Sequence, residues 1–373
     1  MKHEKFFFFG CWNYDNCGKI DNRNSVIIMI ATDRDIYDFG IVAGDNIYSR
    51  KIIDKSGKET KHMYDETFDK ISTSLGILIK HKPKVSPFLN VILGNHDEED
   101  KCILKKEIEQ ISMVPNTRLF LKNNRHSIVE RDLAYYIYLN TNEQHIVDLK
   151  LFLISLLNED LDHRKWLIFV GHEPIYSLKY KKKKGKIKLT ELDERLIQIF
   201  YDLQEKRGFN KMVYLCADTH NFQLLNVRST DEHSNFNLPI VVSGTGGAKL
   251  DDIFPPHLDN RRNSNGEYNT SKINSPNKSF SAKGKPYRIR LEHGLKKHGY
   301  SSITVTPNKI FVNFITCNNK YKFKIGFDGV QSNIQKFKRT NKKLVGCYKK
   351  TTKCKNKKIG CEKTEEKKSK KKK

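Results

Sequence analysis

Short apolar runs and longer amphipathic stretches alternate along the first 220 residues. Five apolar runs each end in a polar turn: Phe6–Phe9, Phe39–Ala43, Phe88–Leu93, Trp166–Val170 and Met212–Cys216. Short runs bounded by turn residues predict buried strands. The stretches between them predict helices over Tyr64–Lys82, Lys101–Ile111, His145–Leu157 and Thr190–Lys206, the last with Thr190 as its N-cap. Alternating strands and helices predict a layered α/β core.

After Asp218 the pattern changes to short strands, which predicts a second sheet. The expected strands are Asn221–Val227, Pro239–Ser243, Tyr300–Thr306, Lys309–Thr316 and Tyr321–Ile325, with a hairpin turn at Pro307 and Asn308. Residues 259–285 are rich in Asn, Ser and Lys, so we expect a flexible surface insertion there. We therefore predict one catalytic domain over residues 1–330 and a disordered basic tail over residues 331–373.

The charge of the chain is concentrated at its C-terminal end. The net charge is +26, and the residues from Lys336 onward hold 18 basic and 3 acidic side chains, so they contribute 18 − 3 = +15 and leave 26 − 15 = +11 for the rest. A positive surface attracts phosphate-bearing substrates, nucleic acid and anionic lipid alike. For the tail we expect nucleic acid or an acidic partner, and a purely solubilising role is the open alternative.

The cysteines and apolar segments bear on location. Eight cysteines are scattered without the framework of small secreted domains, which favours a reducing compartment. The apolar run Phe6–Phe9 is too short for a signal peptide or a membrane span, and no later segment is long enough either. The sequence thus predicts an intracellular, cytoplasmic protein that is not inserted in a membrane.

Polar side chains that can bind metals follow the five predicted strands. The turns are Gly10–Asn13, Gly44–Tyr48, Gly94–Glu98, Gly171–Pro174 and Ala217–Asn221. In open α/β sheets ligands bind outside the carboxyl ends of the strands, so these turns can converge on one site. Together they supply carboxylate, carboxamide, imidazole, phenol and thiol groups, which suit iron, zinc or manganese.

The ordered turns resemble the motif blocks of the calcineurin-like metallophosphoesterases, namely an Asp-bearing first turn, GDN, GNHD or GNHE, GHxP and GHxH. Tyr48 lies three positions after Asp45, which is similar to the GDxxY variant of the purple acid phosphatases, including the tartrate-resistant type. The resemblance covers about Phe6 to Lys249. It implies a four-layer α/β/β/α sandwich of two mixed sheets, two metal ions of iron, zinc or manganese, and hydrolysis of phosphate esters.

The resemblance also implies roles for individual residues. Asp45 resembles the carboxylate that bridges the two metals, and His96 resembles the imidazole that donates a proton to the leaving group. The remaining implied ligands are Tyr48 and His220 for the first metal, and Asn95 and His172 for the second. Asn13, Asn46 and Lys181 are the expected substrate-binding residues.

Two positions depart from the pattern of the family. Cys11 stands where an Asp is usual, and Asp218 stands where the first His of GHxH is usual. A thiolate and a carboxylate can both bind these metals, so the site is either a working variant, a site for one metal, or a decayed site. For Cys11 a small buried thiol is the competing interpretation, with Asp15 approaching from the same loop. The competing function is a non-catalytic scaffold that binds nucleic acid or a partner protein through its basic surface and tail.

Overall fold

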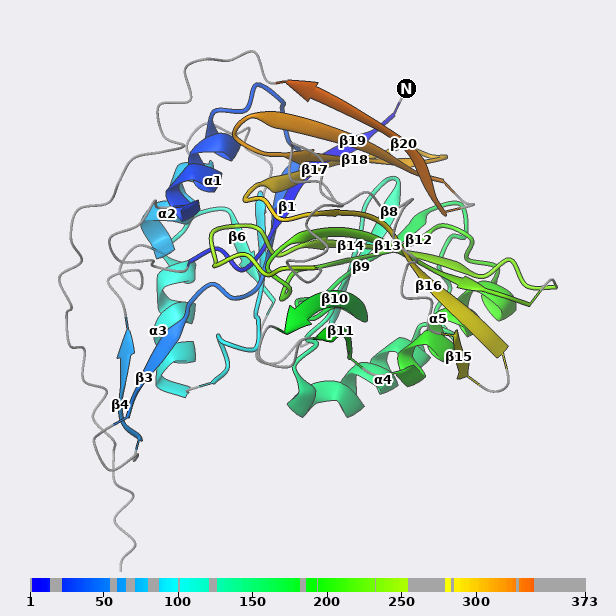
Figure 1. The fold of residues 1–373 in the computed structure, drawn as a ribbon, viewed down its shortest axis with the longest axis horizontal. Coiled ribbons are helices and arrows are strands. Elements are labelled where there is room, and N and C mark those ends of the chain that lie inside the picture. The colour runs from blue at the N-terminus through cyan, green and yellow to red at the C-terminus, as the bar shows by residue number, and fades with distance from the viewer. Residues whose placement is uncertain are drawn as a thin grey trace, which may run out of the picture.

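The structure is a computed structural model, in which the backbone is described for most of the chain. The described residues are 2–13, 22–53, 59–64, 71–79, 87–99, 101–120, 126–181, 186–192, 194–231, 233–253, 279–282, 285–326 and 329–338. Two eight-stranded mixed sheets dominate the fold (Figure 1). The predicted insertion and tail lie mainly outside these residues.

The first sheet contains the N-terminal strand at its centre, with the order β20-β19-β18-β17-β1-β2-β5-β6. Its strands are β1 (Glu4–Phe9), β2 (Phe39–Ala43), β5 (Leu89–Ile92), β6 (Thr117–Leu119), β17 (Tyr300–Val305), β18 (Ile310–Ile315), β19 (Asn319–Gly326) and β20 (Gly329–Lys338). Strands β1, β2, β5 and β6 are parallel, whereas β17 pairs with β1 in the antiparallel direction. The carboxyl ends of β1, β2 and β5 therefore share one edge.

The second sheet has the order β15-β16-β13-β14-β12-β9-β8-β7. Its strands are β7 (Ser127–Glu130), β8 (Ala134–Tyr138), β9 (Trp166–Val170), β12 (Met212–Cys216), β13 (Phe222–Ser229), β14 (Asn237–Ser243), β15 (Ser279–Ala282) and β16 (Lys285–Leu295). The central strands β8, β9, β12 and β14 are parallel. Two hairpins stand apart from the sheets, formed by β3 (Ser49–Ile53) with β4 (Glu59–Tyr64) and by β10 (Tyr176–Lys181) with β11 (Lys186–Glu191).

Helices cover the outer faces of both sheets (Figure 1). Their bounds are α1 (Asn22–Ala31), α2 (Ile71–Ile79), α3 (Lys101–Ser112), the 3-10 helix η2 (Glu143–His145), α4 (Ile146–Ser155) and α5 (Glu194–Arg207). Side chains alternate between the faces of a strand, so Phe6 and Phe8 of β1 pack between the sheets, whereas Phe7 and Phe9 pack with residues of α1 and α2. Residues of α4 and α5 cover the second sheet in the same way. The predicted four-layer α/β/β/α sandwich is confirmed.

Burial on both faces explains why the apolar runs gave the correct strands. The runs at Trp166–Val170 and Met212–Cys216 are strands with those bounds, and every residue in them is buried. The β17–β18 hairpin also turns at Pro307 and Asn308, closed by a Thr306 N–H that donates to the Lys309 carbonyl at 3.0 Å. Continuous hydrophobic runs are typical of parallel strands covered on both faces.

Several element predictions were wrong. Thr190 lies in β11, and α5 begins only at Glu194. The helix expected from Tyr64 is limited, within the described residues, to α2, and Tyr64 ends β4. Strand β20 continues to Lys338, beyond the boundary expected at residue 330, because it pairs with β19 along its length. The residues of β20 are mostly polar, and their strand conformation depends on pairing with β19, which directly precedes it.

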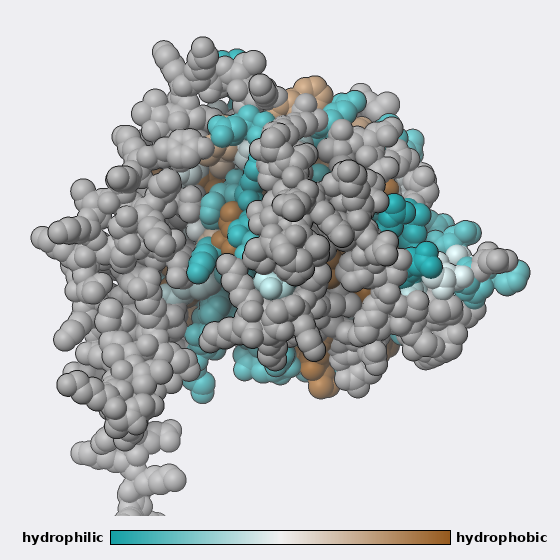
Figure 2. Space-filling model, viewed as in Figure 1, coloured by the Kyte–Doolittle hydropathy of each residue, from teal (hydrophilic) through white to brown (hydrophobic). Residues whose placement is uncertain are grey.

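The described surface is mainly hydrophilic on the face shown in Figure 2, where brown residues form only small groups. Among the described helices, none has the length and apolar character needed to cross a lipid bilayer. Cys11 and Cys216 are free and buried. Cys317 is disulfide-bonded, which the interpretation of the cysteines as reduced did not anticipate. The cytoplasmic location stays a prediction.

Candidate metal centre

The turns after β1, β2, β5, β9 and β12 meet at one edge of the sandwich. Backbone hydrogen bonds join them: the Cys11 N–H donates to the Gly44 carbonyl at 3.0 Å, and the Ala217 N–H donates to the His172 carbonyl at 2.9 Å. The turn at Gly94 lies against Asp45, because a Cβ added to Gly94 would lie 2.3 Å from Asp45 Oδ1. The predicted convergence of the five turns is confirmed.

Cys11, Asp45 and His172 form a compact group of buried donor atoms. One ligand atom from each lies within 4.8 Å of the other two. Thiolate, carboxylate and imidazole are the donor types that zinc and iron accept. Asp45 Oδ2 is buried and accepts no hydrogen bond among the described residues, which leaves a carboxylate oxygen available to a cation. The donor set therefore fits a metal ion.

The orientation of His172 suits a ligand. Its Nδ1 lies 2.7 Å from the Ala43 carbonyl, so Nδ1 carries a proton and donates it. Its Nε2 lies 3.1 Å from Asp45 Oδ1 and 3.1 Å from Asn95 Oδ1. A backbone carbonyl on the far nitrogen commonly orients metal-binding histidines. Three predicted ligands thus point toward one another.

The electrostatics of this pair are unusual for buried groups. Burial lowers the pKa of His172, but the Asp45 carboxylate outweighs it and raises that pKa to about 10. Burial raises the pKa of Asp45, but the charge and hydrogen bond of His172 outweigh it and hold that pKa well below its usual range. Without a metal the two side chains form a buried ion pair. A cation would replace the imidazolium proton.

Tyr48 and His220 form a second pair beside Cys11. The Tyr48 hydroxyl lies 3.3 Å from His220 Nε2, and His220 Nδ1 lies 3.0 Å from the Lys249 carbonyl. The carbonyl requires a proton on Nδ1, so Nε2 keeps its lone pair for Tyr48 or a metal. Burial, followed by the nearby Asp45 and Cys11, raises the pKa of the Tyr48 phenol well above its usual value. The two predicted ligands of the first metal are therefore neighbours.

The backbone is strained at three of the candidate ligands. Four non-glycine residues in the described chain have positive φ, and three are Cys11 (54°), Asp45 (52°) and Asp218 (41°). Such conformations cost about 1–3 kcal/mol each and persist where the surrounding structure enforces them, often at functional sites. The two positions that depart from the family pattern are therefore held in the same strained turns as Asp45.

Cys11 and Asp218, the two residues that depart from the family pattern, differ in how close they lie to the group of donor atoms. Cys11 supplies one of the three clustered donors. Burial, followed by the charges of Asp45 and Asp218, raises the pKa of its thiol well above the usual value, so ionisation requires a cation. Asp218 is half-buried, and its charge acts on both Cys11 and His172. Its role as a ligand stays a prediction.

His96 lies at the exposed side of the group. Its backbone N–H donates to Asp45 Oδ1 at 3.3 Å, and its ring centroid lies 4.9 Å from that of Tyr48. His96 Nδ1 is 2.8 Å from Glu99 Oε1, and the two side chains are 35% and 33% exposed. The predicted proton donor is therefore next to Asp45, the predicted bridging carboxylate, and in reach of a ligand from solvent.

Two of the expected substrate-binding residues, Asn13 and Asn46, make hydrogen bonds to neighbouring parts of the protein. Asn13 and Asn46 are fully buried; Asn13 Nδ2 donates to the Asn46 carbonyl at 2.8 Å, and Asn46 Oδ1 accepts from the Trp12 indole at 2.9 Å. Asn46 Nδ2 is 3.1 Å from Asp97 Oδ2. These amides hold the first two turns together, and a contact with substrate stays a prediction. The side chain of Lys181 and the residue Asp15 lie outside the described part of the chain.

Two residues of the site were missed in the sequence, and a third, Lys179, was predicted only as part of a lysine-rich run that flanks the site. Asp97 lies inside the GNHD block, but nothing local showed that it accepts from the Gly94 N–H at 2.7 Å and the Ile47 N–H at 3.0 Å. Asp251 belongs to no recognised block, yet its Oδ2 accepts from the His220 N–H at 3.2 Å and lies 2.5 Å from Lys179 Nζ. The only signal for Lys179 was its place at the start of a lysine-rich run.

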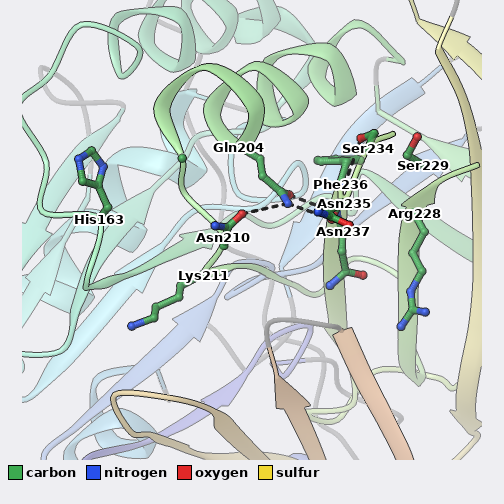
Figure 3. A pocket seen from close by; sticks show the side chains of 11 residues that line it. His163, Gln204, Asn210, Lys211, Arg228, Ser229, Ser234, Asn235, Phe236 and Asn237 are labelled. Carbon is green, nitrogen blue, oxygen red and sulfur yellow. Dashed lines mark hydrogen bonds between the residues drawn. The ribbon is translucent and has the colours of Figure 1, made fainter. Parts of the chain in front are cut away.

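A separate cavity of about 660 Å³ lies elsewhere on the second sheet, between the end of α5, the start of β12 and the β13–β14 connection (Figure 3). Gln204 crosses it, donating to Asn210 Oδ1 at 3.3 Å and to the Asn235 carbonyl at 3.0 Å. Lys211 lies directly before β12 and lines this cavity, whereas the candidate ligands follow the carboxyl ends of their strands. None of the predicted site residues lines this cavity.

Comparisons with known proteins agree with the fold. PhoD is 13% identical over 94% of this chain and 74% of that chain, with a TM-score of 0.54. GAP50, the anchor in the inner membrane complex of Plasmodium, is 14% identical over 92% and 91%, with a TM-score of 0.48. A predicted phosphoesterase of Streptococcus pneumoniae is 11% identical over 91% and 99%, with a TM-score of 0.27.

No protein-family model and no curated protein sequence matches the chain. The last two scores are too low to carry an argument, and at 13% identity the likeness to PhoD establishes the fold alone. The chain has the metallophosphoesterase fold.

Proposed function

We propose that the chain hydrolyses phosphate esters at the site formed by Cys11, Asp45 and His172, with purple acid phosphatases as the most similar type of enzyme. The observation that carries the proposal is this buried donor group at the convergence of five strand ends. Its ligand-like features are the orphaned Asp45 Oδ2 and two histidines whose Nδ1 atoms are bound to backbone carbonyls. We would expect a decayed site to have lost this combination of an unpaired carboxylate oxygen and two oriented histidines.

The residues divide into two sets of ligands around Asp45. Cys11, Tyr48 and His220 would hold one ion, and Asn95, His172 and Asp218 the other, with Asp45 shared between them. When bound, two such ions supply a water of lowered pKa and stabilise the charge on attacking and leaving oxygens. The thiol of Cys11 favours zinc or iron at its position, and the phenol of Tyr48 favours iron.

His96 handles the proton of the leaving group in this proposal. Its Nδ1 lies 2.8 Å from Glu99 Oε1, so the carboxylate orients the ring. Nε2 is then free to give a proton to the departing alkoxide. The partial exposure of His96 lets it reach a substrate that enters from solvent.

The deciding experiment measures metal content and turnover on the same sample. Protein purified without chelator is analysed for metals, and hydrolysis of an aryl phosphate is assayed before and after chelation. We expect about two metals per chain, as in other two-metal sites. His96→Ala should keep the metals but reduce kcat by about 10²–10⁴-fold, the usual contribution of a general acid.

Asn158→Ala, a change in the connection after α4 remote from these ligands, is the matched control and should match the wild type. Absence of metal and turnover after supply of iron, zinc and manganese would contradict the proposal. It would leave the non-catalytic scaffold as the better interpretation.

A further inference from the structure

Lys179 places a cation beside the candidate metal ligands. It lies on β10, and its Nζ is 2.5 Å from Asp251 Oδ2. The side chains of Lys179 and Asp251 are only 22% and 21% exposed, so the pair is largely shielded from water. Ion pairs in such surroundings are screened much less than surface pairs.

Strand β10 is fastened to the turn that carries Asp218 and His220. Ser177 Oγ lies 2.6 Å from Thr219 Oγ1. The Gln223 side chain accepts from the Leu178 N–H at 3.0 Å and donates to the Leu178 carbonyl at 2.9 Å. Lys179 therefore starts from a backbone that is fixed relative to the ligands.

Asp251 connects the cation to His220. The Asp251 N–H donates to the His220 carbonyl at 2.8 Å, and Asp251 Oδ2 accepts from the His220 N–H at 3.2 Å. The same oxygen meets Lys179 Nζ. The ammonium group of Lys179 therefore lies on the same side of the candidate metal centre as His220.

The charge of Lys179 also acts on the site. Burial lowers the pKa of Lys179, but Asp251 and then Asp218 and Cys11 outweigh it, so the amine stays protonated at neutral pH. Its charge in turn lowers the pKa of the Cys11 thiol, against the larger opposing effect of burial. An ammonium has three N–H donors, and one is directed to Asp251. Within the described part of the chain Lys179 Nζ has no second side-chain partner, so two donors are available to an anion.

We propose that Lys179 binds a non-bridging oxygen of the substrate phosphoryl group, which makes the site selective for dianionic phosphate monoesters over monoanionic diesters. This inference rests on the proposed function and adds a residue and a substrate class to it. The physical reason is that a fixed cation of low exposure interacts more strongly with the group of higher charge. Lys179 replaces Lys181 as the lysine of the run that serves the site.

The experiment compares Lys179→Met and Lys179→Arg with Lys296→Met. Lys296 is a matched control because it pairs with Asp252, the residue next to Asp251. Binding of inorganic phosphate to metal-loaded protein is measured by titration calorimetry, together with metal content and kcat/KM for an aryl monoester and an aryl diester. Calorimetry provides a readout that does not depend on turnover.

We expect Lys179→Met to weaken phosphate binding by about 10–100-fold, the size of a lost hydrogen bond to a charged group, with unchanged metal content. Monoester kcat/KM should fall by a similar factor and diester kcat/KM by less. Lys179→Arg should recover part of the loss, and Lys296→Met should bind as the wild type does.

Wild-type phosphate affinity in Lys179→Met would overturn the inference, and so would a loss of metal in that variant, which would show that Lys179 only supports His220. These results differ from failure of the proposed function, in which the wild type itself shows no turnover. In that case the calorimetric comparison of Lys179→Met with the wild type still decides whether Lys179 binds phosphate.

Discussion

At the scale of single residues, the site depends on backbone conformations that few side chains tolerate. Gly44 has φ +77°, and a Cβ there would lie 2.5 Å from His172 Nδ1 and 2.6 Å from the Gly94 nitrogen. Both neighbours are fixed, one as a candidate ligand and one as the start of the next turn. Glycine is required here by conformation and by space together.

Gly44→Ala should lower the free energy of unfolding by more than about 3 kcal/mol and reduce metal content, because strain and overpacking add. Gly208→Ala is the matched control, since Gly208 has φ +71° but no atom within 4 Å of its Cβ position. That variant should cost only about 1 kcal/mol and keep the metals. Chemical denaturation and elemental analysis check both; equal costs would contradict the steric argument.

His298 gives a pH dependence whose sign can be worked out. Burial and the charge of His220 lower its pKa to about 4, against a backbone hydrogen bond with Thr245 that raises it. The unfolded chain has the ordinary value of 6.5, so between pH 6.5 and pH 4 it binds a proton that the folded chain does not. The free energy of unfolding should therefore decrease as the pH is lowered from 6.5 to 4, by about 3 kcal/mol at most.

Denaturant titrations from pH 4 to pH 7 test this expectation. His298→Gln should flatten the curve over the window, whereas the exposed His163→Gln should follow the wild type. Identical pH profiles for wild type and His298→Gln would contradict it.

At the scale of elements, Asp97 joins the turn after β5 to the turn after β2. Its carboxylate accepts from the Gly94 N–H at 2.7 Å and from the Ile47 N–H at 3.0 Å, and Asn46 Nδ2 lies 3.1 Å away. Asp97 is fully buried, and burial followed by the charge of Asp45 raises its pKa. The two turns that carry Asp45 and Asn95 are therefore held by one side chain.

Asp97→Ala should leave the Gly94 and Ile47 N–H groups unsatisfied and cost about 2–4 kcal/mol of stability. Metal affinity should also fall, because Asp45 and Asn95 lose their fixed separation. Asp160→Ala, an exposed change, should stay within about 0.5 kcal/mol of the wild type. Unchanged metal affinity in a folded Asp97→Ala protein would show that the turns are held by other contacts.

At the scale of the whole molecule, the sheets are joined by apolar packing and by one buried acid. Phe6 of β1 lies edge-on to Tyr136 of β8, with ring centroids 5.6 Å apart. Glu4 of β1 accepts from the Tyr136 hydroxyl at 2.9 Å and from the Leu133 N–H at 2.8 Å. These contacts join strands of different sheets, and the described fold ends with β20 at Lys338.

Removal of residues 339–373 should therefore keep the fold and the metals. The deleted segment has 16 basic and 3 acidic residues, so the net charge falls by 16 − 3 = 13, from +26 to +13. Binding to single-stranded nucleic acid should weaken and depend less steeply on salt, because fewer counterions are released. Fluorescence anisotropy at several salt concentrations measures this; an unchanged salt dependence would place the anion-binding surface on the body.

The strands that precede the five candidate metal-binding turns were predictable from local sequence, since continuous apolar runs such as Trp166–Val170 can be satisfied only by burial on both faces. The resemblance to the metallophosphoesterase motifs predicted Asp45 and His172 as metal ligands, and each lies in the turn after such a strand. The start of α5 and strand β20 were not predicted: Thr190 belongs to β11, which pairs with β10, and β20 has few apolar residues although its partner β19 directly precedes it.

The neighbours that complete the site are brought together by tertiary packing. Lys179, Asp251 and His220 are separated by at least 31 residues along the chain, and no local pattern links them. Their contacts arise because β10 packs against the turn after β12. Local sequence determines burial and turn conformation, whereas distances between strand ends depend on how the two sheets pack.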